Sequence, residues 1–218
     1  MKCLFRTITI ICFFVSAGIF ISCQQQVNKV ADENKTMRIP VSVNDSSILT
    51  IDKSPMDMSY FPEDYPKDKM IASGLDNLVA RVIYSRPQKN GRIIFTDSSV
   101  NKNFIQHYGK EWRLGANEAT EIEFFKPVTI NGKNLLKGRY IIYCIPYPGK
   151  WKIIFNDNLF SWGLHMDKTK DIAEIELPVI TNKDEIEFFT MQFQKAAYGC
   201  NLVIAWGDIK VTMPINFN

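Results

Sequence analysis

The chain has 218 residues, of which 46% are hydrophobic and 22% are charged, and its formal net charge is +3. A chain of about 200 residues is long enough to enclose one hydrophobic core. Basic residues (26) and acidic residues (23) are nearly balanced. Because nucleic-acid binding needs a strongly basic patch or stripe, the composition argues against nucleic acid as a partner.

The amino-terminal residues are typical of a secretory signal. Lys2 and Arg6 supply positive charge, and residues 8–21 are almost wholly apolar, which is the arrangement of a signal peptide. The apolar run is shorter than the roughly 18 to 20 residues that a helix needs to cross a bilayer. We therefore expect residues 1–22 to be a lipoprotein signal peptide.

A cysteine directly follows this segment. Ser22-Cys23 resembles the lipobox of bacterial lipoproteins, in which the thiol receives a diacylglycerol. The alternative is an ordinary cleaved signal with an incidental cysteine. Lipid on Cys23 would anchor the exported protein stably to a bacterial membrane, since two or more acyl chains suffice. We expect the outer membrane, on its periplasmic or surface face.

The remaining chain divides into a tether and a domain. Residues 23–46 are polar and mixed in charge, which is typical of a flexible linker. Residues 47–218 are expected to form one domain. Its first part carries Pro55, Pro62 and Pro66, and we interpret residues 54–69 as an extended, irregular lead-in.

Strand patterns dominate the rest of the domain, because apolar and polar residues alternate with period two. About nine strands separated by turns favour a mostly β fold, a single antiparallel β-sandwich or flattened barrel with little helix. Asn131-Gly132 is a strong hairpin signal. The expected strands are residues 78–84, 91–95, 121–124, 128–130, 139–145, 151–155, 173–177, 189–193 and the run 202–206 with 209–215, and short helical turns are expected within 102–112 and 159–167.

Residues 108–120 read YGKEWRLGANEAT, a stretch similar to the signature of a bacterial family known as domain of unknown function 2911. The family's other blocks are resembled, in order, by Tyr84-Ser85-Arg86-Pro87 with Gly91-Arg92, by residues 128–133, 137–140 and 151–156, and by Ser161-Trp162-Gly163. The resemblance implies a compact β domain, often on exported proteins of the Bacteroidetes type, without an assigned activity. The polar residues 96–106 depart from the family pattern.

A polar cluster lies inside this stretch and comprises Trp112, Arg113, Asn117, Glu118 and Thr120. In a structural corner, Arg113 would pair with Glu118, Asn117 would bond the backbone of a turn and Trp112 would fill the core. In a ligand site, Arg113 would hold a carboxylate or phosphate. In a catalytic site, Glu118 would act as general acid or base if it were desolvated. The sequence leaves these three interpretations open.

Metal and nucleophile chemistry have weaker support. His107, Glu111, His165 and Asp167 would form a metal site only if two loops meet. No HExxH or GxSxG motif is present. We therefore expect no metal and no cofactor, and we assign no catalytic residue.

The cysteines and tryptophans of the domain carry further expectations. Cys144 and Cys200 either form a disulfide, which an exported location permits, or remain two buried thiols. Trp151 and Trp206 stand on the apolar phase of their strands and are expected in the core. Trp162 stands in a loop and is expected to be exposed.

Together these features predict an exported, lipid-anchored cell-envelope protein with a binding or structural role. One alternative is a carbohydrate- or peptide-binding module, and another is a hydrolase-like enzyme that uses Glu118 and Arg113. The partners expected are the membrane, through the lipid on Cys23, and a small-molecule, glycan or peptide ligand.

Overall fold

The computed structural model describes residues 54–72 and 77–217 of the chain. The expected signal peptide, Cys23 and the tether 23–46 lie outside the described residues, so what the sequence predicts for them stays a prediction. Within the described ranges, no helix is both long enough and apolar enough to cross a membrane.

Strands make up most of the described residues. In chain order the elements are β1 (Met56–Phe61), α2 (Tyr65–Ile71), β2 (Ala80–Ser85), β3 (Ile93–Thr96), β4 (Phe104–His107), β5 (Thr120–Phe124), β6 (Val128–Ile130), β7 (Lys133–Leu135), β8 (Gly138–Tyr147), β9 (Lys150–Asn156), the 3-10 turn η2 (Lys168–Lys170), β10 (Asp171–Ala196) and β11 (Gly199–Phe217).

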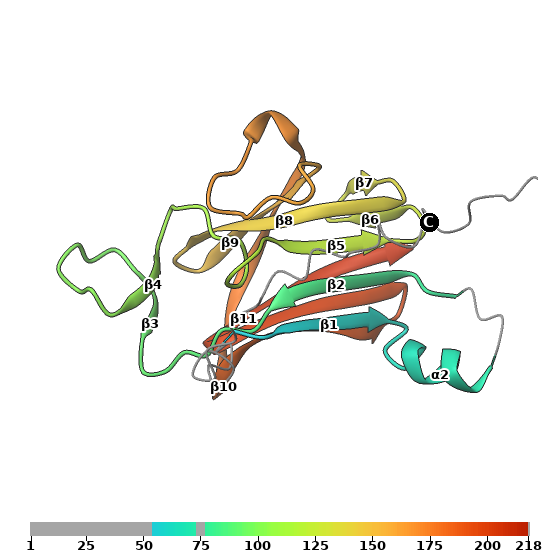
Figure 1. Ribbon diagram of the computed structural model, residues 1–218, viewed down its shortest axis with the longest axis horizontal. Coiled ribbons are helices and arrows are strands. Elements are labelled where there is room, and N and C mark those ends of the chain that lie inside the picture. Colours follow the sequence, from blue (N-terminus) through green and yellow to red (C-terminus); the bar gives the residue numbers. More distant parts are fainter. Residues whose placement is uncertain (1–53, 73–76, 218) are drawn as a thin grey trace, which may run out of the picture. The chain divides into compact units, whose positions relative to one another are not determined.

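Nine of these strands form one antiparallel sheet in the order β1-β2-β5-β8-β9-β10-β11-β6-β7. The long strand β10 pairs with β9 along residues 171–178 and with β11 along residues 179–196. Register shifts between Thr181, Ile186 and Thr190 mark bulges, which bend a strand. β10 thereby belongs to two layers, one that contains β9 and one that contains β11. Figure 1 shows β10 and β11 behind β1 and β2.

The two layers enclose the core without closing into a barrel. At the sheet edge formed by β1, where the layers are not joined by a strand ladder, the backbone N–H of Phe193 in β10 donates to Ser59 Oγ of β1 over 3.1 Å. The prediction of a mostly β, antiparallel, sandwich-like domain is confirmed, and the flattened barrel is not the form adopted.

Aromatic rings fill one end of the core. Trp112 stacks on Trp206 with ring centroids 5.9 Å apart, and it meets Trp151 and Phe189 edge-on at 5.7 and 5.2 Å. These are the offset and T-shaped arrangements that aromatic pairs prefer. Trp151 and Trp206 are therefore core residues, as their strand phase predicts.

The amino-terminal lead-in is more regular than its prolines suggest. The prediction of irregular structure over 54–69 is wrong, because β1 pairs with β2 and α2 follows. Pro55 precedes β1 and Pro62 follows it, while Pro66 lies in the first turn of α2. Proline is tolerated in the first turn of a helix because the backbone N–H groups of that turn have no partner within the helix.

The two short helices expected at 102–112 and 159–167 are also absent from these described segments. Residues 104–107 form β4, which pairs in parallel with β3. Phe160 and Gly163 have φ of +64° and +79°, outside the helical region. The nearest helical turn is η2, after Asp167, whose side chain accepts from the Thr169 backbone N–H.

The question of the cysteine pair is settled by the structure. Cys144 and Cys200 are both free and buried. Burial raises the pKa of the Cys144 thiol well above its usual value and that of Cys200 to about 12. They are two buried thiols, the second of the two alternatives.

A second, smaller cluster lies on the outer face of β8 and β9. Ile141, Tyr143 and Ile154 are buried, although they alternate with core residues and so point outward. Tyr143 Oη donates to Asp171, and Asn156 Nδ2 donates to the Asp167 carbonyl. These bonds hold the connection between β9 and β10, residues 157–170, against this face.

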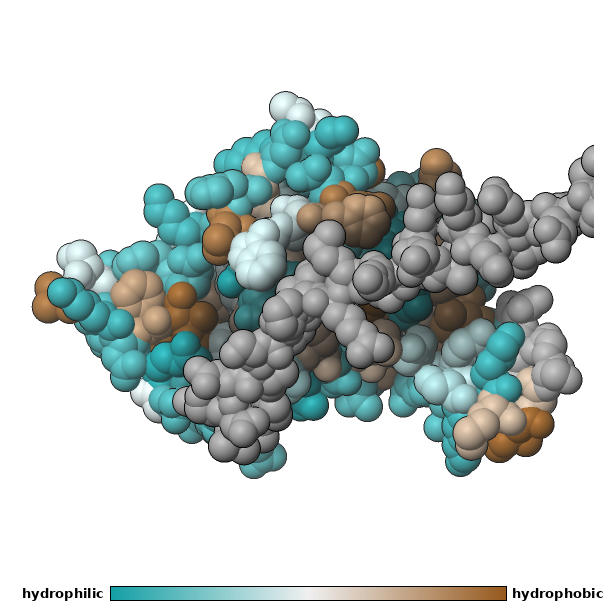
Figure 2. Space-filling view, in the orientation of Figure 1, coloured by the Kyte–Doolittle hydropathy of each residue, from teal (hydrophilic) through white to brown (hydrophobic). Residues whose placement is uncertain are grey.

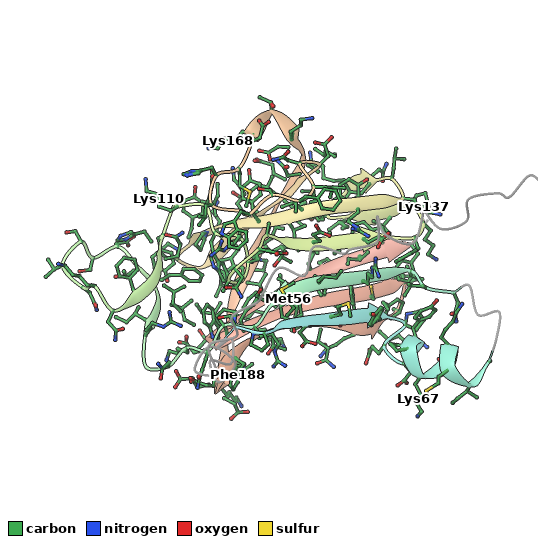
Figure 3. All side chains as sticks on the ribbon, viewed as in Figure 1. Met56, Lys67, Lys110, Lys137, Lys168 and Phe188 are labelled. Carbon is green, nitrogen blue, oxygen red and sulfur yellow. The ribbon has the colours of Figure 1, made fainter. Side chains whose placement is uncertain are left out.

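This connection forms an outward projection of the domain. Figure 3 places Lys168 near its tip, above β8 and β9. The face of the molecule seen in Figure 2 is mainly hydrophilic, and hydrophobic residues stand on it in small groups. The connection itself contributes three exposed apolar residues, Phe160, Trp162 and Leu164.

Candidate functional site

The residues from Trp112 to Thr120 form a loop that is closed by its own hydrogen bonds. Trp112 Nε1 donates to the Gly115 carbonyl over 3.2 Å, and Thr120 Oγ1 donates to the Leu114 carbonyl over 2.6 Å. Gly115 has φ of +151°, and a Cβ atom there would lie 3.0 Å from the Ser85 carbonyl oxygen. Glycine is therefore required for the loop to lie against β2.

The Ser161-Trp162-Gly163 motif docks on this loop. Arg113 Nη1 donates to the Trp162 carbonyl over 3.1 Å. A Cβ atom on Gly163 would lie 2.9 Å from the Cβ atoms of Arg113 and Ala119, and φ at Gly163 is +79°. Two sequence blocks more than forty residues apart thus meet through a contact that only glycine fits.

The predicted cluster divides into buried and exposed members. Trp112 and Thr120 are buried and bonded within the fold. Asn117 has φ of +59° and donates through Nδ2 to the Ser54 carbonyl over 3.1 Å, so it holds the loop to the start of β1. Trp112 fills the core, as the corner interpretation has it, whereas Asn117 bonds the backbone of distant Ser54 instead of that of its own turn.

The pairing of Arg113 with Glu118, which the corner interpretation requires, is not formed. Arg113 Nη1 donates to the carbonyls of Asn117, over 2.5 Å, and of Trp162. Among the described residues, no carboxylate forms an ion pair with Arg113. Glu118 is exposed and lines a different pocket. Burial lowers the pKa of the Arg113 guanidinium, because lost hydration disfavours its charge.

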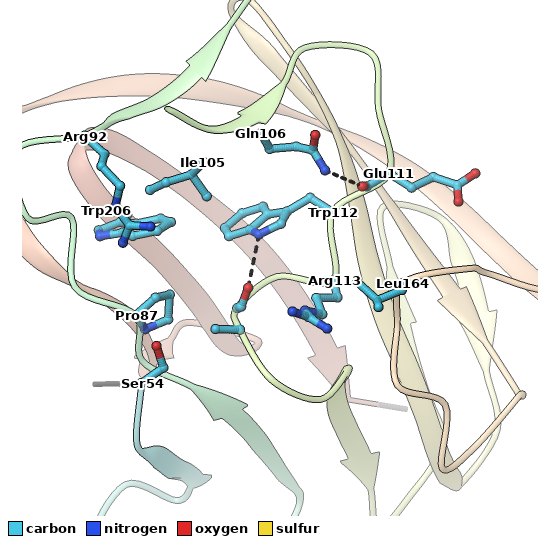
Figure 4. A pocket seen from close by; sticks show the side chains of 12 residues that line it. Ser54, Pro87, Arg92, Ile105, Gln106, Glu111, Trp112, Arg113, Leu164 and Trp206 are labelled. Carbon is cyan, nitrogen blue, oxygen red and sulfur yellow. Dashed lines mark hydrogen bonds between the residues drawn. The ribbon is translucent and has the colours of Figure 1, made fainter. Parts of the chain in front are cut away.

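Arg113 borders a pocket of about 300 Å³, which we call the arginine pocket (Figure 4). Trp112 and Trp206 contribute aromatic surface, and Arg92 enters from the side opposite Arg113. The lining residues are Ser54, Pro87, Arg92, Ile105, Gln106, Glu111, Trp112, Arg113, Gly115, Ala116, Leu164 and Trp206.

The charge in this pocket is unbalanced. Arg92 donates through Nε and Nη2 to the carbonyls of Lys89 and Gln88 and, like Arg113, forms no ion pair within the described chain. Glu111 is the lining carboxylate, but it pairs with Lys168 over 2.8 Å. In Figure 4 its carboxylate points away from both arginines. The pocket therefore presents two guanidinium groups that no carboxylate of the described residues neutralises.

Sequence reasoning missed Arg92, Gln106 and Trp206 as members of this pocket. Gly91-Arg92 belongs to a block that resembles the family, and this resemblance could have indicated Arg92 as a candidate site residue. Trp206 is nearly a hundred residues from Trp112, and only their stacking reveals the shared wall. Gln106 reaches the pocket through β4, where its Nε2 donates to the Glu111 carbonyl.

The residues considered for a metal site have other neighbours. His107 Nδ1 lies 3.1 Å from the Thr96 carbonyl oxygen, Glu111 pairs with Lys168, and His165 is exposed. Over residues 54–72 and 77–217, no three His, Cys, Asp or Glu side chains gather in a way that would hold a metal ion.

Comparison with known proteins identifies the family but no activity. The family model described as "Protein of unknown function (DUF2911)" matches residues 66–215, which include β2 to β10 and the arginine pocket apart from Ser54. No curated protein and no solved structure matches the chain. Because the matched residues cover well over half of its length, the chain belongs to the DUF2911 family of proteins of unknown function.

Proposed function

We propose that this protein is an exported, lipid-anchored binding protein of the bacterial cell envelope, which takes a carboxylate-bearing ligand in the arginine pocket. The observation that carries the proposal is the pair of guanidinium groups, Arg92 and Arg113, in one pocket without a carboxylate partner among the described residues. A pocket of about 300 Å³ is at the lower end of the range for small-ligand sites.

The hydrogen bonds of Arg113 leave it free to bind a carboxylate. They leave from Nη1, so within the described chain its Nε and Nη2 atoms remain available. Those two N–H groups point the same way and match the two oxygens of a carboxylate. Leu164, which lines the pocket and is exposed, would contact the apolar part of the ligand.

The hydrolase alternative receives less support. It needs Glu118 beside Arg113, and these residues line different pockets. General acid or base catalysis by a carboxyl group works best when burial raises its pKa toward neutrality, whereas the Glu118 side chain is exposed. The buried members of the cluster, Trp112 and Thr120, stabilise the loop and are not offered as ligand contacts.

Titration calorimetry tests the binding. The mature full-length chain in detergent is titrated with hexanoate and with neutral hexanamide, and hexanoate alone should bind. Arg113→Gln should weaken hexanoate at least about tenfold, because a hydrogen bond to a charged group contributes about 1.5 to 3 kcal/mol. Lys150→Gln removes the same charge from an exposed pair with Glu176 and should have no effect. Equal binding of acid and amide would refute the proposal.

The source of the carboxylate is separated by a second titration. Glucuronate, compared with glucose, represents an acidic sugar, whereas hexanoate represents the acyl chain and carboxylate of a peptide-like ligand. Tighter binding of glucuronate than of hexanoate would assign the pocket to acidic glycans.

Export and anchoring are supported by the sequence of the first 23 residues. Lys2, Arg6 and the apolar residues 8–21 precede Ser22-Cys23, the order found in lipoprotein signals. Cells fed an alkyne-tagged palmitate should incorporate the label into the wild-type chain and not into Cys23→Ala. A wild-type chain without label would remove the lipid from the proposal and leave the binding site untouched.

A further inference from the structure

We infer that a second pocket, formed by Glu118, Ala119, Glu121, Phe160, Ser161 and Trp162, is a subsite for an ammonium group. We call it the acidic pocket. The inference rests on the proposed function, because it extends the carboxylate ligand of the arginine pocket to one that also carries an amine. Its volume is about 220 Å³, enough for a small cationic group.

The acidic pocket combines negative charge with exposed aromatic rings. Phe160 and Trp162 are 85% and 58% exposed, which is unusual for residues of this size. Glu118 is exposed and has no ion pair among the described residues. Glu121 forms an ion pair with Arg139 over 3.5 Å, so Glu118 supplies the unpaired negative charge of this pocket. No cation lines this pocket, so its charge is opposite to that of the arginine pocket.

This combination selects a cation. The face of an aromatic ring carries negative charge, and an ammonium group above it is attracted, most strongly over tryptophan. A nearby carboxylate adds Coulomb attraction at short range. A neutral ligand would pack against the aromatic rings, but the Glu118 carboxylate would add little to its affinity. The chemistry of the pocket therefore favours a primary amine.

The two pockets are joined by one chain segment. Phe160 and Trp162 line the acidic pocket, and Leu164, two residues further, lines the arginine pocket. The Trp162 carbonyl accepts a hydrogen bond from Arg113, so the segment is fixed to the arginine that we assign to the carboxylate. A ligand lying across this segment would meet cations at one end and a carboxylate at the other. That charge pattern fits an amino-acid- or peptide-like molecule better than an acidic sugar.

The test compares straight-chain acids with and without a terminal amine. The mature full-length chain is titrated with hexanoate, with 6-aminohexanoate and with shorter and longer members of the same series. Without an acidic subsite, the amine should weaken binding, because it makes the chain less apolar. With the subsite, at least one amino acid of the series should bind roughly three- to tenfold tighter than the matching alkanoate, as cation–π and exposed charge pairs allow.

Two substitutions locate the effect. Glu118→Gln and Trp162→Ala should abolish the gain from the amine while hexanoate binds as before. Trp162→Ala keeps the backbone carbonyl that Arg113 uses, so the arginine pocket is retained. Glu176→Gln, which removes an exposed carboxylate paired with Lys150, should leave the gain unchanged.

Failures of the two proposals are distinguishable. If hexanoate does not bind, the proposed function is wrong, and hexylamine then tests the acidic pocket alone by a Glu118-dependent affinity. If hexanoate binds and no amino acid of the series improves on it, the ammonium subsite is refuted. A gain that survives both Glu118→Gln and Trp162→Ala would refute it equally.

Discussion

Replacing Gly163 with alanine would test the contact that joins the two family motifs. The new Cβ atom would lie 2.9 Å from the Cβ atoms of Arg113 and Ala119, closer than carbon atoms approach without repulsion. Since Arg113 and Ala119 belong to a closed loop, neither can move away freely. The substitution also places a non-glycine residue at φ of +79°.

The expected cost has two parts. A left-handed backbone conformation costs a non-glycine residue about 1 kcal/mol, and overpacking a tight contact costs about 1 to 3 kcal/mol. Gly163→Ala should therefore lower the free energy of unfolding by about 2 to 4 kcal/mol. Gly149→Ala is the matched control, because Gly149 has φ of +80° and nothing within 4 Å of its added Cβ.

Urea unfolding of the full-length variants measures both costs. Gly149→Ala should lose only the backbone part, about 1 kcal/mol, with an unchanged dependence on urea. The difference between the two variants reports the contact between the motifs. Equal loss in Gly163→Ala and Gly149→Ala would refute the tight docking of the 157–170 segment on the signature loop.

Three further predictions concern the core and the loop. Thr120→Val leaves the Leu114 carbonyl without its 2.6 Å donor and should cost about 1 to 3 kcal/mol in urea unfolding; no loss would contradict the closed loop. Burial raises the pKa of Tyr84 to about 12 from 10.0. The stability that the buried, protonated Tyr84 hydroxyl contributes to the folded state is therefore complete below pH 10 and falls as pH rises toward 12. Tyr84→Phe should therefore lose less stability than wild type between pH 9 and 11. Cys144 and Cys200, buried thiols with raised pKa, should react with a chromogenic disulfide reagent only after unfolding; rapid labelling of the native chain would contradict their burial.

Local patterns predicted the strands well where a strand and its turn are defined by neighbouring residues. Asn131 and Gly132 have φ of +46° and +76°, as a tight hairpin requires, and β6 and β7 pair on either side of them. Local sequence patterns failed to predict the extent of a strand where pairing between distant residues determines it. Residues 173–177 and 189–193 look like separate strands because polar residues lie between them, yet bulges let both belong to β10.

The site was predicted in part for the same reason. Trp112, which the sequence places in the core, and Thr120, for which it indicates no role, both have hydrogen-bond partners inside their own loop. Arg113 donates to the nearby carbonyl of Asn117 and to the distant carbonyl of Trp162, and no pattern around Arg113 indicates the second partner. A nearby acid such as Glu118 is the natural expectation, but the loop turns it outward. Arg92, which directly precedes β3, joins the pocket through the fold, and no local pattern indicates this.

The continuity of β10 has a consequence for how the domain opens. The first part of this strand, residues 171–178, pairs with β9 in one layer, and the longer second part, residues 179–196, pairs with β11 in the other. Separating the layers would require breaking the ladder on one side of a single covalent strand. Amide protons of β9 and β11 should therefore exchange with solvent through the same global opening, with similar protection, as one cooperative unit.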